Sequence, residues 1–230
     1  YAMADEFLDA VRALWRGGPV DFRGEWFSFH GRLSGPRPLQ ENPLIVNAGS
    51  SPAGRAFAAR HADWIFMVGR NEAEVQEKMA DAHARTAASG RATGSIRLML
   101  DLNVILAETD EQAAEEAARV RASVDVDAAR EYMVGLLGGM EAYRNIFRDS
   151  DELATLTHLG SGAAAVRGHG SAETIAAQIV HLHRDYGCKG LALSFNHWRP
   201  EDIRTFGRSV LPLLEDAGVW QSPFKRQRTW

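Results

Sequence analysis

The sequence PLIVNAGSSPAGR, residues 43–55, joins a short apolar strand to the start of a helix. Its first part, Leu-Ile-Val at 44–46, is apolar and partly β-branched, as in a buried strand. Pro52 is favoured at the first helical position and Ser51 at the N-cap before it, so a helix is expected to begin here. A strand that leads directly into a helix is the repeating unit of parallel α/β folds.

The same turn has the properties of an anion-binding site. A helix that begins at the end of a strand presents free backbone N–H groups and the positive end of its dipole at one place. Ala48 and Gly49 are small enough for a ligand to approach the backbone, and Ser50 and Ser51 add hydroxyl donors. The turn therefore predicts a site for a phosphorylated cofactor. The alternative is an ordinary capped helix after a strand.

Alternation of strands and helices continues along the chain. Apolar runs predict strands, and apolar residues at helical spacing predict helices. The expected strands are 44–48, 64–68, 98–106 and 191–195, with a short strand or hairpin at 24–30; the expected helices are 3–15, 52–61, 72–89, 110–122, 128–137, 172–186 and 200–217. Four such strands correspond to half of a TIM-type (β/α)8 barrel, which needs eight, and an open doubly wound sheet is the competing architecture.

Composition limits the class of protein. The 230 residues are 45% hydrophobic with a net charge of −4, which suits a globular domain and gives no electrostatic case for nucleic acid. No apolar run reaches the roughly 20 residues needed to span a bilayer. We therefore expect no membrane partner, and the charge balance favours a small molecule as the partner. The single Cys188 excludes an internal disulfide, which suits the reducing cytoplasm.

The organisation expected from these patterns is one barrel domain over residues 1–230. A probable insertion or mobile segment at 124–170 interrupts the regular rhythm. The sequence enters a helical pattern at 1–7 without a leading strand, so we expect the later part of a longer barrel. The sequence shows no P-loop, Ser-His-Asp signature or metal-ligand cluster, and its catalytic residues are not identified.

Several motifs carry a resemblance to a known family. They are YAMADEF at 1–7 with LW at 14–15, FRGEWF at 22–27, PRP at 36–38, NAGSSPAG at 47–54 with FAARHAD at 57–63, and VLPLL at 210–214. Together they resemble the bacterial luciferase-like flavin monooxygenases. The similarity is greatest to the branch with the pyrimidine, long-chain alkane and dibenzothiophene-sulfone monooxygenases. A departure occurs at 166–173, where this chain lacks the Val-Gly-Ser/Thr-Pro-Glu stretch common in that group.

The resemblance implies a TIM-type barrel that uses reduced FMN, supplied by a separate flavin reductase, to insert oxygen from O2 into a small organic substrate. It also implies further copies of the chain as partners. Tyr1, Ser50 and Ser51 match residues that contact the FMN phosphate in the family, and Ala48 and Gly49 lie in the same turn. The alternatives are a flavin- or deazaflavin (F420)-dependent oxidoreductase of the same superfamily and a noncatalytic flavin- or phosphate-binding fragment.

Two residues at expected strand ends have both a functional and an ordinary reading. The amide of Asn47 is expected either to meet a ligand or to serve the turn. His197 is expected either to exchange protons or to be an incidental surface histidine, and the second reading is favoured. His61 is expected to be structural, since a cation suits a helix end. Cys188 is expected to be a small core residue.

Overall fold

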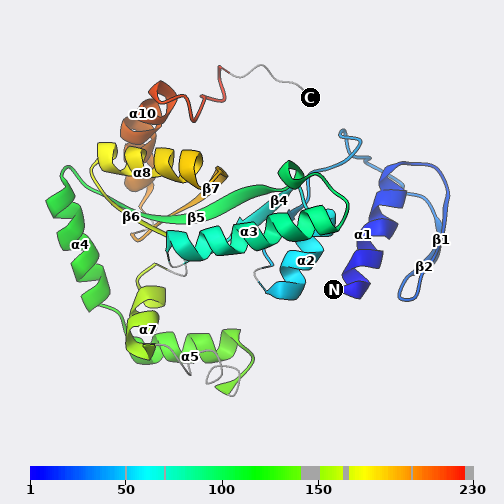
Figure 1. Ribbon diagram of the computed structural model, residues 1–230, viewed down its shortest axis with the longest axis horizontal. Helices are drawn as coiled ribbons and strands as arrows, with labels where there is room; N and C mark the ends of the chain where they lie inside the picture. Colours follow the sequence, from blue (N-terminus) through cyan, green and yellow to red (C-terminus); the bar gives the residue numbers. More distant parts are fainter. Residues whose placement is uncertain (50, 70, 141–150, 163–165, 198, 226–230) are drawn as a thin grey trace. The chain divides into compact units, whose positions relative to one another are not determined.

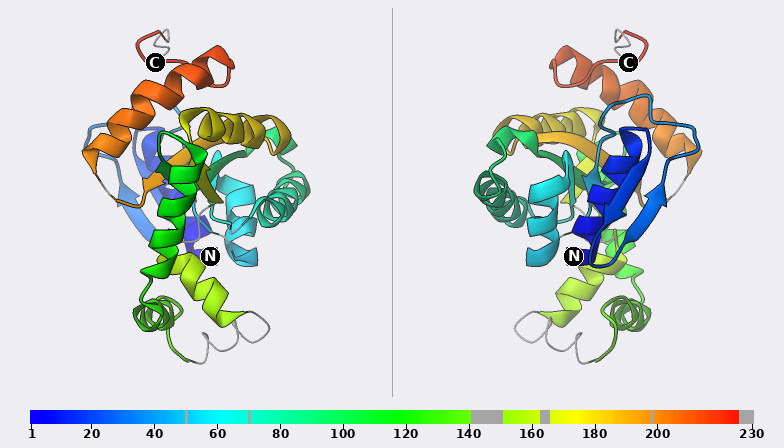
Figure 2. Two further views of the ribbon diagram at one scale, coloured as in Figure 1. Left: turned by 90° about the vertical axis from the view of Figure 1, so that its left-hand side faces the viewer. Right: turned by 90° about the vertical axis from the view of Figure 1, so that its right-hand side faces the viewer.

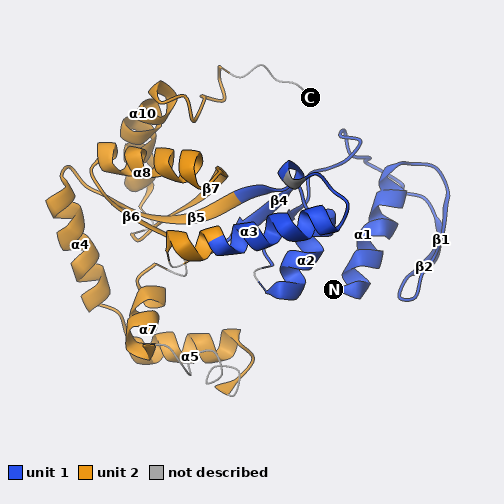
Figure 3. Cartoon of the chain, viewed as in Figure 1, with its two compact units in different colours: residues 1–67, 77–98, 226–230 blue, residues 68–76, 99–225 orange. Residues whose placement is uncertain are grey.

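The computed structural model describes residues 1–49, 51–69, 71–140, 151–162, 166–197 and 199–225. These residues form two compact units, shown in different colours in Figure 3. Unit 1 contains the described residues of 1–67 and 77–98, and unit 2 those of 68–76 and 99–225.

Unit 1 begins with a helix and a hairpin. The helix is α1 (Ala2–Trp15), followed by β1 (Val20–Arg23) and β2 (Ser28–Gly31), which pair antiparallel (Figure 1). The strand or hairpin expected at 24–30 is therefore a hairpin, but its strands lie on either side of a turn at 24–27. In Figure 2 the hairpin lies beside α1.

The side chain of Glu6 fixes this hairpin to α1. Its carboxylate accepts hydrogen bonds from the backbone N–H groups of Glu25, Trp26 and Phe27 at 2.7, 2.9 and 2.6 Å. A Cβ at Gly24 would lie 2.0 Å from Glu6 Oε1, so a side chain there would displace this carboxylate from its present position. Burial raises the pKa of Glu6, but the three backbone donors lower it more, and the pKa lies below its usual value.

A parallel strand pair with its connecting helix follows. Strand β3 (Val46–Asn47) leads into α2 (Pro52–His61) and then β4 (Trp64–Met67). The strands β3 and β4 are parallel, with Val46 opposite Trp64. Helix α2 buries Phe57, Ala58 and Ala59, and β4 buries Ile65 and Met67, as expected for a helix that covers a sheet.

The chain next passes through α3 (Glu72–Ala88), the 3-10 turn η1 (Thr93–Ser95) and β5 (Arg97–Leu106). Both α3 and β5 have residues in each unit. On β5, one face carries alternate apolar residues that are buried in the core, and Asn103 of the other face is also buried. The alternate apolar residues are Leu98, Leu100, Leu102 and Val104.

Unit 2 is built on β5. The strand β6 (Val166–Gly170) pairs with it in parallel, from Leu102 opposite Val166 to Leu106 opposite Gly170, and β7 (Cys188–Phe195) also pairs with β5. Two helices cover these strands, α4 (Asp110–Ala122) against β6 and α8 (Ala172–Asp185) against β6 and β7.

Strand β6 was not among the four strands expected from the sequence, and that count was wrong. Its sequence, Val-Arg-Gly-His-Gly, has one β-branched residue and two glycines, so its strand propensity is low. A Cβ at Gly168 would lie 2.7 Å from Gln178 Oε1 and 3.0 Å from Ile175 Cδ1. Glycine in this strand therefore allows α8 to pack closely without moving these side chains, and it conceals the strand pattern.

Near the end of the described chain lies one continuous helical rod, seen in orange and red in Figure 2. It consists of α9 (Pro200–Thr205), the π-helical turn η2 (Phe206–Val210) and α10 (Leu211–Asp216). Pro212 has no N–H to donate to the preceding turn, which explains a widened turn at that point. The helix expected at 200–217 is confirmed, with this local change.

In the described residues of the expected insertion segment at 124–170, two helices occur. They are α5 (Val126–Leu136) and α7 (Glu152–Gly160), which pack around the fully buried Leu156. Elsewhere, Cys188 is buried, and burial raises the pKa of its thiol, so the expected core role is confirmed. None of the helices in the described ranges is long and apolar enough to cross a membrane.

Candidate functional site

Ser51 lies at the turn between β3 and α2, as expected. It is the N-cap of α2, in an extended conformation, and its Oγ accepts a hydrogen bond from the N–H of Gly54 at 3.1 Å. Pro52 occupies the first helical turn. The hydroxyl group of Ser51 thus uses an acceptor lone pair for the cap and keeps its O–H as a donor. Ser50 lies outside the described residues.

Two glycines approach each other closely across this turn. A Cβ at Gly49 would lie 2.7 Å from the Cα of Gly54, and a Cβ at Gly54 would lie 2.7 Å from the Cα of Gly49. Such distances are shorter than any side chain tolerates, so both positions require glycine. Gly54 was not among the site residues expected from the sequence, although a glycine in the first turn of a helix is a signal for close contact.

The side chain of Asn47 belongs to the same turn. Its Oδ1 accepts a hydrogen bond from the N–H of Gly49 at 2.8 Å, across the intervening Ala48. This contact is the turn role, one of the two readings of Asn47. It directs that backbone N–H to the protein's own side chain and fixes the path of residues 47–49.

Tyr1 comes to this turn from α1. A Cβ at Gly54 would lie 2.8 Å from the Tyr1 hydroxyl oxygen, so the phenol reaches the glycine pair. Its ring contacts the ring of Phe57 with a centroid separation of 5.3 Å, while the residue remains 53% exposed. The structure therefore brings Tyr1, Gly49 and Ser51 together, with Gly54 between them.

The charge distribution along α2 favours an anion at this turn. Its first turn, 52–55, contains no acidic residue, so the positive end of the helix dipole has no carboxylate of its own. The start of α8 differs, because the N–H of Ser171 donates to the Asp110 carboxylate at 2.7 Å. Both helices have a serine N-cap, but of these two only α8 has a carboxylate of the protein, that of Asp110, at the positive end of its dipole.

The other end of α2 is surrounded by donors. Arg91 donates to the carbonyl oxygens of Ala59 and Ala62 at 2.9 Å each, and Ser89 donates to that of Ala59 at 3.3 Å. Arg12 of α1 donates to the carbonyl of His61 at 3.1 Å. Cationic groups at this end complement the negative end of the helix dipole.

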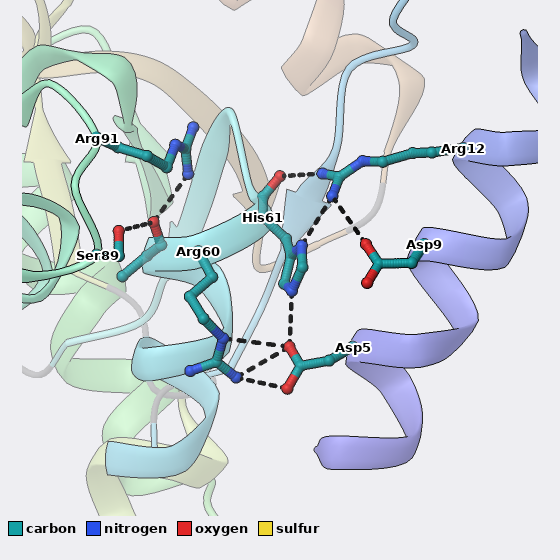
Figure 4. Close-up of polar contacts among 8 residues, drawn as sticks. Asp5, Asp9, Arg12, Arg60, His61, Ser89 and Arg91 are labelled. Carbon is teal, nitrogen blue, oxygen red and sulfur yellow. Dashed lines mark hydrogen bonds and ion pairs between the residues drawn. The ribbon is translucent and has the colours of Figure 1, made fainter. Parts of the chain in front are cut away.

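A cluster of charged side chains joins α1 to α2 (Figure 4). Arg60 donates three hydrogen bonds to the Asp5 carboxylate at 2.7, 2.9 and 3.3 Å, and His61 Nε2 lies 2.6 Å from Asp5 Oδ1. His61 Nδ1 lies 2.9 Å from Nη1 of Arg12. Because a guanidinium only donates, Nδ1 accepts and Nε2 carries the proton that faces Asp5.

The carboxyl of Asp5 is stabilised in its charged form by this cluster. Burial raises the pKa of Asp5, but the hydrogen bonds from Arg60 and His61 and the positive charge of Arg60 lower it more, so the pKa lies below its usual value. His61 was expected to be structural, and it is held between α1 and α2. Its partners lie about 50 residues away in the sequence, so local pattern gave no signal for them.

Three further histidines, His181, His183 and His197, have hydrogen-bond or ion-pair partners within the chain. His197 is 2.8 Å from Glu116 of α4, His181 contacts Asp185 and Glu72, and His183 Nδ1 lies 2.8 Å from the carbonyl of Cys188. In the part of the chain that the structure describes, no group of three or more metal-ligating side chains occurs.

Comparisons of this chain with known proteins agree on one family. The profile of the family described as luciferase-like monooxygenase matches residues 1–187. One component of the pristinamycin IIA synthase of Streptomyces pristinaespiralis is 43% identical over 98% of this chain and 59% of its own length. The FMNH2-dependent dimethylsulfone monooxygenase of Pseudomonas putida is 28% identical over 94% of this chain and 59% of its own.

Among solved structures, riboflavin lyase with modified FMN and riboflavin is similar to this chain with a TM-score of 0.82 and 26% identity. The match covers 98% of this chain and 59% of the lyase. It confirms the expected barrel-type α/β fold of this superfamily. The chain spans about three fifths of the length of the curated relatives it matches.

Proposed function

The chain belongs to the luciferase-like monooxygenase family, and from this premise we propose that it forms part of an FMN-dependent monooxygenase. We infer that the FMN phosphate binds at the turn between β3 and α2. The observation that carries this proposal is the contact between Gly49 and Gly54 at the start of a helix whose first turn lacks an acidic residue.

The donor set at this turn fits a phosphate monoester. The hydroxyl groups of Tyr1 and Ser51 are neutral donors, and the helix dipole adds positive potential. The absence of side chains at Gly49 and Gly54 leaves room for phosphate oxygens against the backbone. The FMN named for two of the proteins compared above supports the choice of this ligand.

Reduced FMN, when bound, would supply the electrons and activate O2 for transfer of one oxygen atom to an organic substrate. The residues of this chain hold and orient the cofactor. Ser51 and Tyr1 would hold the phosphate through their hydroxyl groups, while Asn47 fixes the turn and Phe57 supports the Tyr1 ring. These interactions orient the cofactor by one end, which leaves the flavin ring system for contacts elsewhere in the complete protein.

The partners follow from this activity. We propose a small organic substrate, O2, a flavin reductase that delivers the reduced cofactor, and further copies of the chain. The reduced state of a buried Cys188 suits a reducing compartment, and we propose the cytoplasm. The alternative cofactor is deazaflavin F420, which the same superfamily would use for hydride transfer.

Titration of FMN against variants of Ser51 tests the proposed site. Removing one neutral hydrogen-bond donor in Ser51→Ala should weaken FMN binding about fivefold to tenfold. Ser51→Asp should weaken it further, because a carboxylate repels the phosphate and accepts the donors that would bind it. Quenching of flavin fluorescence measures both affinities.

The matched control is Ser171→Ala, which removes the serine N-cap of α8 but leaves α2 unchanged. It should lower stability by a similar amount and keep FMN affinity at the wild-type value. Equal affinities of wild type and Ser51→Asp would refute the phosphate assignment. Binding of F420 without binding of FMN would support the hydride-transfer alternative.

A further inference from the structure

Two consecutive acidic residues of α1 hold different parts of unit 1. Asp5 binds Arg60 and His61 at the end of α2, whereas Glu6 binds the backbone of the hairpin turn. Both carboxylates have a lowered pKa and several hydrogen bonds. Asp5 and Glu6 are therefore comparable hydrogen-bond acceptors on the same helix. Of the two, only Asp5 contacts α2, the helix that begins at the phosphate turn.

A continuous series of contacts runs from Asp5 to the phosphate turn. The ring of His61 lies 5.0 Å from that of Phe57, which lies 5.3 Å from that of Tyr1. The backbone also connects the two ends, because the N–H of Asp5 donates to the carbonyl of Tyr1 at 2.9 Å. Tyr1 thus has support from its own helix and from α2.

The contacts of His61 fix the angle at which these two helices meet. Its imidazole is only 10% exposed, accepts from Arg12 on one nitrogen and faces Asp5 with the other. Arg12 and Asp5 lie two turns apart on α1, so His61 holds the helix at two points. A helix held at one point could rotate about that point, whereas a helix held at two points cannot. The Tyr1 hydroxyl therefore remains beside Gly54.

We propose that Asp5 and His61 are positioning residues that hold the Tyr1 hydroxyl at the Gly49–Gly54 turn and thereby make the site prefer a flavin with a phosphate. This inference rests on the proposed function, because it assumes that the phosphate binds at that turn. The chemistry selected is the phosphate monoester: FMN and riboflavin have the same ring system and differ in this group.

The test compares the affinities of FMN and riboflavin in variants of residues 1–230. In Asp5→Asn and in His61→Leu, the ratio of FMN to riboflavin affinity should fall about threefold to tenfold, the effect of one misplaced hydrogen-bond donor. His61→Gln keeps an N–H donor near Asp5 and should recover part of the ratio. Flavin fluorescence quenching measures both ligands.

Glu6→Gln is the matched control. It loosens the hairpin from the same helix, so it should lower the melting temperature and leave the affinity ratio at the wild-type value. If the role of Asp5 were purely structural, Asp5→Asn would also lower the melting temperature without changing the affinity ratio, or it would weaken FMN and riboflavin binding equally. Either outcome would overturn the inference.

Tyr1→Phe separates this inference from the proposed function. If Tyr1→Phe lowers the ratio and Asp5→Asn does not, the phosphate site stands and the positioning role fails. If wild type binds FMN and riboflavin equally well, the phosphate site itself is wrong. A lower ratio of FMN to riboflavin affinity in Tyr1→Phe, Asp5→Asn and His61→Leu supports both the phosphate site and the positioning role.

Discussion

The contact between Gly49 and Gly54 sets a requirement on single residues. Replacement of a helical glycine by alanine usually stabilises a protein by up to about 1 kcal/mol. In Gly54→Ala, however, the new Cβ would lie 2.7 Å from the backbone of Gly49 and 2.8 Å from the Tyr1 hydroxyl. We expect a net loss of about 1–3 kcal/mol in the free energy of unfolding, measured by denaturant titration.

Gly135→Ala is the control for this prediction. Gly135 lies in α5, and a Cβ there would meet no atom within 4 Å, so this substitution should be neutral or stabilising by up to about 1 kcal/mol. If Gly54→Ala were as stable as Gly135→Ala, the close approach of the two glycines would be wrong.

At the scale of residues, the sequence predicts those features of the site that depend on neighbours in the chain. The N-cap role of Ser51 follows from Ser-Pro after a strand, because capping is a local interaction. The position of Tyr1 beside Gly54 was expected only through family resemblance. The links from Asp5 to His61 and Arg60 depend on how α1 meets α2, which no local pattern specifies.

At the scale of elements, one carboxylate joins the starts of α4 and α8. Asp110 accepts hydrogen bonds from the Ser171 N–H at 2.7 Å and the Thr174 hydroxyl at 2.9 Å. The hydrogen bond from the backbone N–H of Ser171, followed by the one from the side-chain hydroxyl of Thr174, holds the pKa of Asp110 below its usual value. The folded protein therefore favours the charged form more than the unfolded chain does.

This linkage predicts how the stability of Asp110→Asn depends on pH. A carboxyl with a lowered folded pKa contributes stability above its unfolded pKa, near 3.8, and loses that contribution as the pH falls toward the folded pKa. Asp110→Asn should therefore be less stable than wild type at pH 7, and the difference should shrink below about pH 4. The free energies of unfolding of wild type and Asp110→Asn, measured at pH 7 and at about pH 3, give this difference.

Glu111→Gln provides the comparison, since Glu111 is also acidic and in the first turn of α4. It should alter stability at pH 7 only slightly. A difference between wild type and Asp110→Asn that stayed constant down to pH 3 would contradict the linkage.

The elements themselves were largely predictable, because apolar periodicity is a local property of strands and amphipathic helices. The helices expected at 52–61 and 110–122 agree with α2 and α4 at both ends. Strand β6 could not be predicted in this way. Its residues are selected by contact with α8, and Gly168 satisfies that contact at the expense of strand propensity.

At the scale of the whole molecule, apolar side chains on β3 and just before it remain exposed. Val46 is 54% exposed and Leu44 57%, and β4 is the one described strand that pairs with β3. Exposed apolar strands associate with other chains. We expect residues 1–230 to self-associate in sedimentation velocity, and Val46→Lys to reduce that association.

Leu39→Lys is the comparison, because Leu39 is fully exposed in a loop and outside any strand. This substitution adds the same charge and should leave the association state close to that of wild type. A monomeric wild-type chain with a single cooperative unfolding transition would contradict the prediction.

The glycine pair also has a consequence for protein engineering. Gly49 and Gly54 stay in contact only if the four residues between them keep their number, so this turn has a fixed length as well as fixed glycines. A peptide tag, a circular permutation or a split point placed there would separate the two backbones. Leu39 is fully exposed and lies in an irregular stretch, so this position is the better place to open the chain.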